Sequence, residues 1–241
     1  MKNINNKSDM LFWNHVSELR GRLIKSLLAI AIFTAVAYMF SDIAIQILAQ
    51  PKIDLMNKIN LQVLKITSMF MIKIYISMVI GLMLSMPIIL YQIWRFVSPA
   101  IEKKMSISIL FMFLMSSVFF VFGGYFSYKI IIPLSISFFT SLSSNYVPVD
   151  YNITLENYMT YVIWIIFVGG LIFQLPIVSI IFKKLGVIDH RTLADNRRYS
   201  ILAIFVISAL LTPPDPFSQI LFIIPLIVLY ELSILIIRFL K

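Results

Sequence analysis

The chain reads Leu210-Leu211-Thr212-Pro213-Pro214-Asp215-Pro216-Phe217-Ser218-Gln219 between two strongly apolar stretches. Proline lacks an amide donor and holds φ at about −65°, so three prolines in four positions end the first helix. Each also pushes the preceding residue toward extended geometry. Pro216 suits the first turn of the next helix, and Asp215 is suited to cap that helix and to face its positive dipole end. The stretch therefore predicts a rigid hairpin between two membrane helices, with the structural residues Pro213, Pro214, Asp215 and Pro216.

The composition is that of a membrane protein. Hydrophobic residues make up 60% of the 241 residues and charged residues 13%, whereas soluble domains carry roughly 25% charge. The mean hydropathy is +0.94. No Gly/Ser-rich linker interrupts the apolar segments, so we predict a single domain over residues 1–241. The absence of cysteine excludes thiolate ligands, and His15 and His190 lie far apart in the sequence, so we predict no metal and no cofactor.

Six stretches are apolar enough to be read as spanning helices, each of which needs roughly 20 apolar residues. They cover residues 23–40, 70–90, 105–126, 158–182, 199–211 and 217–237. The sequence therefore predicts an all-α polytopic integral membrane protein with six transmembrane helices, of which helices five and six are short. Helix five reaches only about 20 Å, so we interpret it as crossing a thinned membrane. The alternative is that helices five and six form a re-entrant hairpin that stays in the cytoplasmic half.

Basic residues indicate the orientation. Most of the twenty Lys and Arg residues fall in the N-terminal segment, the second and fourth connections and the C-terminal tail. The positive-inside rule then predicts that both termini are cytoplasmic. This topology signal and contact with anionic lipids account for the net charge of +9, so we predict no nucleic-acid partner. Because residues 23–40 are longer than a signal-peptide core and no Arg/Ser-rich transit segment precedes them, we expect a retained helix in a bacterial plasma (inner) membrane.

Four motifs occur in order along the chain. The first, before helix one, is Asn14-His15-Val16-Ser17-Glu18-Leu19-Arg20-Gly21-Arg22. The second is Pro87 followed, after helix two, by Tyr91-Gln92-Ile93-Trp94-Arg95-Phe96-Val97-Ser98-Pro99. The third, in helix four, is Phe173-Gln174-Leu175-Pro176, and the fourth is the hairpin at 211–219. Together they resemble the TatC family over nearly the whole chain.

The resemblance implies the large polytopic subunit of the Sec-independent, twin-arginine translocase. Members of that family recognise signal peptides that carry paired arginines and help to move folded proteins across the membrane. The resemblance also implies TatA- and TatB-type single-span partner subunits, a homo-oligomer within the complex, and the proton-motive force as the source of energy. It places signal-peptide binding at Glu18, Arg20, Phe96, Pro99 and Glu102.

The chemistry of Glu18 fits this role. A receptor for paired guanidinium groups needs carboxylates, because arginine forms bidentate, charge-assisted hydrogen bonds with them. The predicted cytoplasmic face also offers Asp9, Asp189 and Asp195, but it is Glu18 that corresponds to the N-terminal glutamate of the family. The alternative is an i,i+4 ion pair with Arg22, worth roughly 0.2–0.5 kcal/mol. The two roles can coexist.

Phe96 and Pro99 match the first cytoplasmic loop of the family, but the chain departs from the pattern after them. The family's glutamate six residues after that proline is replaced here by Met105, whereas Glu102 lies three residues earlier. If this stretch is helical, positions 102 and 105 share a face, so Glu102 can substitute for the missing carboxylate. The alternatives are that Glu102 pairs with a neighbouring lysine and that Phe96 is an ordinary interfacial anchor.

Two polar residues within the predicted spans are candidates for docking a partner helix, because polar groups in the bilayer are expensive. Gln174 precedes Pro176 in helix four. It can face a partner helix, or it can bond a neighbouring helix or the backbone freed by Pro176. Glu231 in helix six matches a family glutamate, and the alternative is a buried, protonated or tyrosine-bonded packing residue.

No catalytic motif is found. The chain has no GxxxxGK(S/T) loop and no HExxH motif, and both histidines lie outside the predicted spans. We therefore predict that the protein is not an enzyme. The alternative function is a small proton- or ion-coupled secondary transporter, a class that commonly has internal repeats and several ionisable groups near the midplane. Here only Glu231 is clearly placed within a predicted span.

Overall fold

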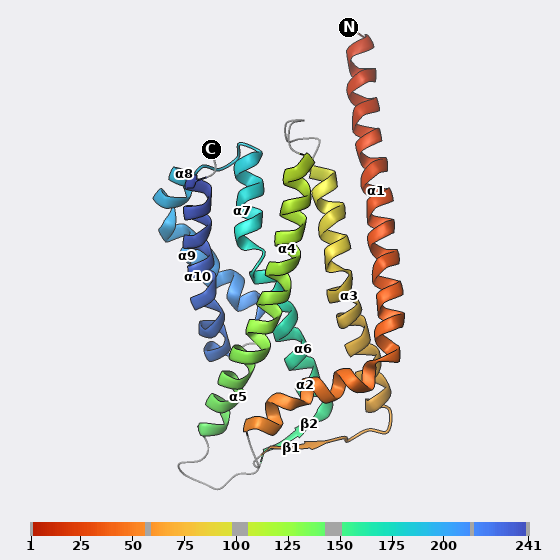
Figure 1. The fold of residues 1–241 in the computed structure, drawn as a ribbon, viewed down its shortest axis with the longest axis vertical. Helices are drawn as coiled ribbons and strands as arrows, with labels where there is room; N and C mark the ends of the chain where they lie inside the picture. Colours follow the sequence, from red (N-terminus) through yellow and green to blue (C-terminus); the bar gives the residue numbers. More distant parts are fainter. Residues whose placement is uncertain (1, 56–58, 98–105, 143–150, 213–214, 240–241) are drawn as a thin grey trace.

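The computed structural model describes residues 2–55, 59–97, 106–142, 151–212 and 215–239, and it is almost entirely helical there (Figure 1). In chain order the elements are α1 (Lys2–Met39), α2 (Ser41–Leu55), β1 (Ile59–Gln62), α3 (Ser68–Val97), α4 (Ser106–Phe126), η2 (Ser127–Ile131), α5 (Ile132–Ser141), β2 (Tyr151–Thr154), α6 (Leu155–Ile172), α7 (Leu175–Lys184), α8 (His190–Asp195), α9 (Arg197–Leu211) and α10 (Pro216–Phe239). The element η2 is a π-helical turn.

The long helices lie alongside one another and define two ends of the molecule (Figure 1). α1 begins and α3, α7 and α10 end at one of them, which we call the termini end. The helix α2 and the strands β1 and β2 lie at the opposite end, which we call the strand end. The first and last helices therefore have their outer ends on the same side of the molecule.

Five helical stretches in the described part of the chain are long and apolar enough to cross a membrane. They are Val16–Met39, Ser68–Phe96, Met112–Ser141, Leu155–Lys184 and Pro216–Phe239. The predicted helical membrane architecture is confirmed. The predicted fifth span corresponds to α9, which has 15 residues. The predicted third span ends at Phe126, whereas the observed one continues through η2 and α5, since a single π-turn can be inserted into a helix without ending it.

A short parallel pair of strands closes the strand end. Ile59 pairs with Tyr151 and Gln62 with Thr154, and Gln62 Nε2 donates to Asn152 Oδ1 at 3.2 Å. The helix α2 is tied to its neighbours by an ion pair of 2.7 Å between Lys73 Nζ and Asp42 Oδ1. No strand is predicted from the sequence, because each has only four residues and therefore no readable period.

The long helix α1 packs along α3. Where the two helices meet at Gly81, an added Cβ would lie 2.3 Å from Thr34 Oγ1 and 2.5 Å from the Thr34 amide nitrogen. Such contacts are too short for any side chain larger than hydrogen, and small residues commonly mark close helix contacts in membranes. Gly81 therefore fixes the register of α1 against α3.

The centre of the molecule is α6. Its residues Val162, Ile165 and Val168 are fully buried, and the helix lies against α3, α4 and η2. A Cβ on Gly123 of α4 would lie 2.4 Å from the carbonyl oxygen of Gly169 in α6. The two backbones are thus in direct contact, and this contact positions the break between α6 and α7 against α4.

Candidate functional site

Glu18 lies about halfway along α1 and is paired with Arg22 one turn later. Arg22 Nε donates to Glu18 Oε1 at 3.1 Å, and Arg22 Nη2 forms an ion pair with the same oxygen. The Arg22 side chain is 13% exposed and that of Glu18 is 39% exposed. The i,i+4 pair considered as the alternative for Glu18 is therefore present, and it leaves the carboxylate partly accessible. Arg20 is exposed.

Phe96 lies in the last turn of α3 and is half-buried. The positions of Phe96 and Glu18 along the two helices can be compared by counting residues from the contact between Thr34 of α1 and Gly81 of α3. Glu18 is sixteen residues from Thr34 and Phe96 is fifteen from Gly81, which correspond to about 24 Å and about 22 Å of helix. Glu18 and Phe96 are therefore at nearly the same level, on neighbouring helices. Pro99, Glu102 and Met105 lie outside the described residues.

Gln174 lies at the break between α6 and α7 and is 8% exposed. Its Nε2 donates to the carbonyl oxygen of Ser116 at 3.0 Å, and its Oε1 accepts from Ser116 Oγ at 2.5 Å. Ser116 belongs to α4, so the amide joins two helices. Of the predicted alternatives, this geometry corresponds to a bond with a neighbouring helix. Ser116 was not singled out from the sequence, because nothing in a lone serine of an apolar helix indicates its partner.

Glu231 of α10 forms an ion pair with Arg197, the first residue of α9. The distance from Arg197 Nη2 to Glu231 Oε2 is 2.8 Å, and the two side chains are 52% and 43% exposed, respectively. The neighbouring Tyr230 hydroxyl donates instead to the carbonyl oxygen of Leu193 at 2.7 Å. The structure thus has a half-exposed, arginine-paired carboxylate in place of the buried, protonated or tyrosine-bonded one considered above. This pairing could not be predicted from the sequence, since Arg197 and Glu231 are separated by a helix and a turn.

The hairpin before α10 contains the expected cap. Asp215 Oδ1 accepts from the amide of Ser218 at 2.6 Å, and α10 begins at Pro216. Pro213 and Pro214 lie outside the described residues. On the α9 side, the Leu211 carbonyl oxygen accepts from Trp164 Nε1 at 2.8 Å. The predicted capping role of Asp215 is confirmed, and the end of α9 is anchored to α6.

Asp189 follows α7 in the connection to α8 and is held by two groups. Lys183 Nζ forms an ion pair with Asp189 Oδ1, and His190 Nδ1 lies 3.5 Å from the same oxygen. The hydrogen bond from Lys183, followed by one from the His190 backbone, lowers the pKa of Asp189 from 3.8 to about 2. This carboxylate is therefore paired within its own loop, as Glu18 is paired within α1.

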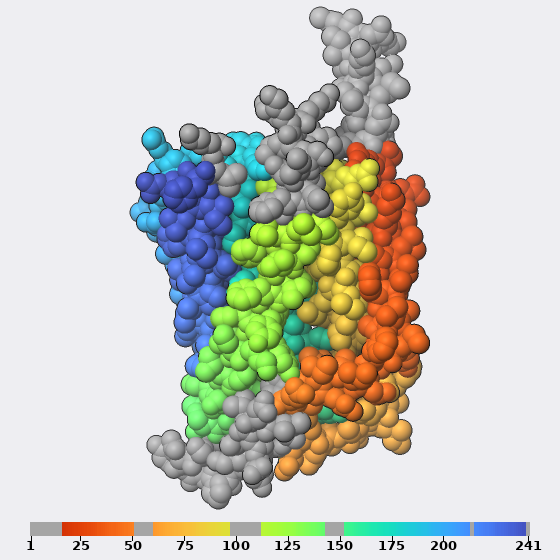
Figure 2. All heavy atoms as spheres, in the orientation of Figure 1, coloured from red at the N-terminus to blue at the C-terminus, as the bar shows by residue number. Residues whose placement is uncertain are grey.

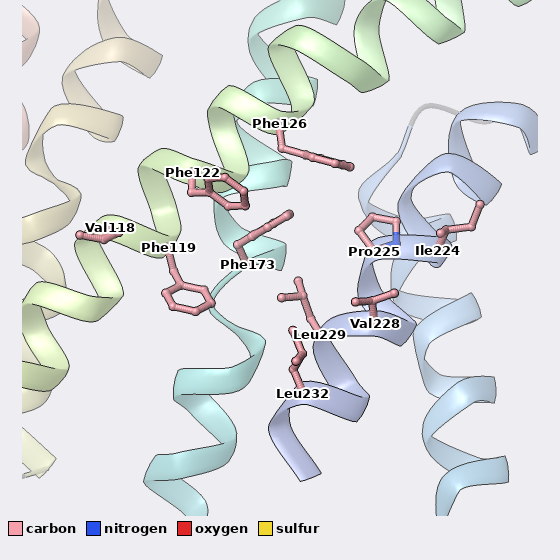
Figure 3. Close-up of a pocket in the computed structure, with 10 residues that line it drawn as sticks. All are labelled: Val118, Phe119, Phe122, Phe126, Phe173, Ile224, Pro225, Val228, Leu229 and Leu232. Atoms are coloured by element: carbon pink, nitrogen blue, oxygen red, sulfur yellow. The ribbon is translucent and has the colours of Figure 1, made fainter. Parts of the chain in front are cut away.

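An apolar groove of about 520 Å³ lies between α4 and α10, with Phe173 at its floor (Figure 3). All ten lining side chains are hydrocarbon. They are Val118, Phe119, Phe122, Phe126, Phe173, Ile224, Pro225, Val228, Leu229 and Leu232. The groove was not found from the sequence, because its aromatic residues have the spacing of ordinary core positions. Among the described residues, no cluster of three or more His, Asp or Glu side chains is arranged to hold a metal ion.

Comparison with known proteins gives consistent matches. The family described as Sec-independent protein translocase protein (TatC) matches residues 14–225. A Sec-independent protein translocase protein TatC from Carboxydothermus hydrogenoformans is 36% identical over 233 residues, covering 96% of this chain and 94% of that protein. The protein of the same description from Aquifex aeolicus is 36% identical over 223 residues, covering 91% of both.

Two crystal structures also match, one described as Twin Arginine Translocase Receptor TatC and the other as the same receptor in DDM. They superpose with TM-scores of 0.83 and 0.84 at 34% identity. The first covers 93% of this chain and 98% of its own, and the second covers 92% and 99%. The likeness therefore extends over nearly the full length of the chains compared.

Proposed function

Because the chain belongs to the TatC family of Sec-independent protein translocase proteins, we propose that it is the signal-peptide receptor and core subunit of a twin-arginine translocase. In this role it binds signal peptides with paired arginines and exports folded proteins, with the proton-motive force as the energy source. The chain is a translocase component and not an enzyme. The observation that carries the receptor role is a half-exposed glutamate, Glu18 of α1, at nearly the same level as Phe96 in the last turn of the adjacent helix α3.

The proposed topology has six membrane crossings with both termini in the cytoplasm of a bacterial cell. The common end of α1 and α10 supports an even number of crossings. The five long spans then require α9 to be the sixth, crossing as a short helix in a thinned part of the bilayer. In this orientation the termini end is cytoplasmic, which agrees with its basic residues.

The proposed recognition step is an exchange of arginines at Glu18. An i,i+4 pair of this kind contributes only roughly 0.2–0.5 kcal/mol, so Arg22 is a weak competitor. An incoming guanidinium can approach the exposed part of the carboxylate and bond it in a planar, bidentate manner that lysine cannot reproduce. Phe96 then contacts the apolar part of the signal. Arg20, Pro99 and Glu102 complete the proposed site, with Glu102 as the substitute for the carboxylate absent at Met105.

The proposed partners are TatA- and TatB-type single-span subunits, further copies of this chain, and anionic lipids at the basic end. Gln174 and Glu231 are the proposed polar positions for docking partner helices. The half-exposed carboxylate of Glu231 supports such a contact more directly than the inward-facing amide of Gln174, which is bonded to Ser116. The alternative, a small ion-coupled transporter, is disfavoured by membership of a translocase family and by the pairing of Glu231 with Arg197.

The test is photo-crosslinking from a probe at Phe96. Two precursors are compared, one with its arginine pair and one with both arginines changed to lysine. We expect crosslinks to the first only, and loss of those crosslinks in Glu18→Gln. A probe at Leu142, at the strand end, serves as the matched control and should not react with either precursor. Equal crosslinking of both precursors at Phe96 would refute arginine recognition at this site.

A further inference from the structure

The apolar groove is embedded at membrane depth. Its walls are Val118 to Phe126 of α4 and Ile224 to Leu232 of α10, which lie within two of the candidate spans. In Figure 2, atoms of α7 are visible between α4 and α10, so α7 forms the back of the same gap toward the termini end. With no polar side chain in its lining, the groove can satisfy only a hydrocarbon occupant.

The size of the groove limits that occupant. A membrane helix is about 10 Å across and about 30 Å long, and so occupies more than about 2,000 Å³. The groove encloses about 520 Å³, which falls within the roughly 300–1,000 Å³ of small-ligand sites. It therefore accommodates a flexible acyl chain, whereas a helix could place only one face against it.

Two basic residues lie between the groove and the termini end of the molecule, in the last turns of α7 and α10. The last turns of α7 and α10 carry Lys184 and Arg238, respectively. Lys184 Nζ lies 3.6 Å from Met112 Sδ, so this side chain reaches across from α7 to α4. Among the described residues, neither Lys184 nor Arg238 is in an ion pair, whereas the adjacent Lys183 is paired with Asp189.

The distance between the basic residues and the groove corresponds to that between the head group and the acyl chains of a lipid. Met112 precedes Val118 by six residues on α4, and Leu232 precedes Arg238 by six on α10. Each separation corresponds to about 9 Å along the helix. Positive charges thus lie one to two helical turns above an apolar recess, at the end of the spans where lipid head groups are found.

We propose that the groove holds one anionic phospholipid of the leaflet at the termini end, which is the cytoplasmic leaflet in the topology proposed above. The phosphate lies at Lys184 and Arg238, and one acyl chain extends over Phe119, Phe122 and Phe173. This lipid site does not depend on signal-peptide recognition, because none of these residues belongs to the proposed receptor site. It fills the space between α4 and α10 that the protein's own side chains leave open.

The test uses phosphatidylglycerol and phosphatidylcholine that carry the same photoreactive group in the middle of one acyl chain. The purified full-length protein is reconstituted with each probe, irradiated, and the labelled residues are mapped by mass spectrometry. We expect labels at 118–126 and 224–232, with about tenfold more from phosphatidylglycerol, because each basic residue contributes a favourable interaction with anionic head groups. Val228→Trp should reduce the labelling of these two stretches by filling the groove.

Charge variants separate this site from general attraction to the basic surface. The double variant Lys184→Gln with Arg238→Gln should lower phosphatidylglycerol labelling of the groove to the level of phosphatidylcholine. Arg191→Gln removes a charge from the exposed surface of α8 and should leave the preference unchanged, as should Lys184→Arg, which keeps the charge. Thermal unfolding in detergent verifies that each variant is folded. If the double variant fails to fold, Arg238→Gln alone should still reduce the preference severalfold.

Three results would overturn the proposal. Equal labelling by the two lipids would show that the groove is in contact with bulk bilayer only. Preference for phosphatidylglycerol that survives loss of both cations would mean that the phosphate is bound elsewhere. Absence of groove labelling by either probe in the folded protein would show that no lipid chain enters it.

Discussion

Gln174 and Ser116 bond each other in both directions across the contact of α4 with the break between α6 and α7. The Gln174 amide donates to the Ser116 carbonyl oxygen at 3.0 Å and accepts from the Ser116 hydroxyl at 2.5 Å. Both residues are buried, at 8% and 1% exposed. The pair therefore satisfies both the oxygen and the nitrogen of the buried Gln174 amide, and the Ser116 hydroxyl, at the contact of α4 with the α6–α7 break.

Replacement of Gln174 by leucine should destabilise the fold. The substitution keeps the volume similar but removes both bonds, and interhelical hydrogen bonds in membranes contribute about 0.6 kcal/mol on average and up to about 1.7 kcal/mol. We expect a loss of about 1 kcal/mol in the free energy of unfolding, measured by titration with SDS. Ser117→Ala is the control, since Ser117 Oγ bonds the Phe113 carbonyl oxygen of its own helix. A loss as large in Ser117→Ala would contradict the role given to the pair.

From the sequence, candidate site residues could be predicted only where they belong to a local motif. Glu18, Phe96 and Asp215 were identified because they stand in local motifs, and Asp215 indeed caps α10. The partners Ser116 and Arg197 could not be found, since each meets its partner across a distance of 58 or 34 residues. A single sequence contains no local signal for such contacts, which depend on how the helices pack.

Gly81 should be sensitive to any side chain. In Gly81→Ala the new Cβ would lie 2.3 to 2.6 Å from atoms of Thr34, so α1 must move away from α3. Overpacking of this kind typically costs about 1–3 kcal/mol, and we expect a lower unfolding temperature in detergent. Gly21→Ala on α1 is the matched control, because a Cβ there meets nothing within 4 Å. It should be neutral or slightly stabilising, by up to about 1 kcal/mol. Equal tolerance of both substitutions would contradict the tight α1–α3 contact.

The helical architecture was predictable because apolar runs of roughly 20 residues leave few alternatives in a bilayer. Irregular features were not. The strands β1 and β2 have four residues each and pair across about 90 positions, so only the folded chain brings them together. The turn η2 inserts a π-helical turn between α4 and α5, which leaves the apolar pattern continuous. The break at Gln174 was marked only by Pro176, which also occurs in the first turn of an uninterrupted helix.

The ion pair between Lys183 and Asp189 gives a prediction for pH. Because the pKa of Asp189 is lowered from 3.8 to about 2, the charged form is favoured in the folded state. The pair therefore stabilises the fold fully above pH 3.8, and this contribution is lost as the pH falls from 3.8 toward 2. We expect the carboxyl carbon of Asp189, followed by NMR in labelled protein and assigned with Asp189→Asn, to titrate near pH 2.

Two neighbouring lysines provide the control for that titration. In Lys183→Gln the main cause of the shift is removed, so the pKa of Asp189 should rise toward 3.8. Lys184→Gln should leave it unchanged, since Lys184 Nζ contacts Met112 and not Asp189. A similar rise in both variants would mean that the general positive potential of the loop, and not the bond from Lys183, sets the pKa.

The pair between Arg197 and Glu231 tests where the membrane ends on α10. The side chains are 52% and 43% exposed, and pairs in contact with water contribute about 0–1 kcal/mol. We therefore expect Glu231→Gln to change the free energy of unfolding by less than about 1 kcal/mol, measured in lipid nanodiscs. Arg197→Glu should destabilise more through repulsion, and Arg197→Glu combined with Glu231→Arg should restore stability. A loss of about 3–5 kcal/mol in Glu231→Gln would instead indicate a pair inside the hydrocarbon, where removal of one partner leaves an uncompensated charge.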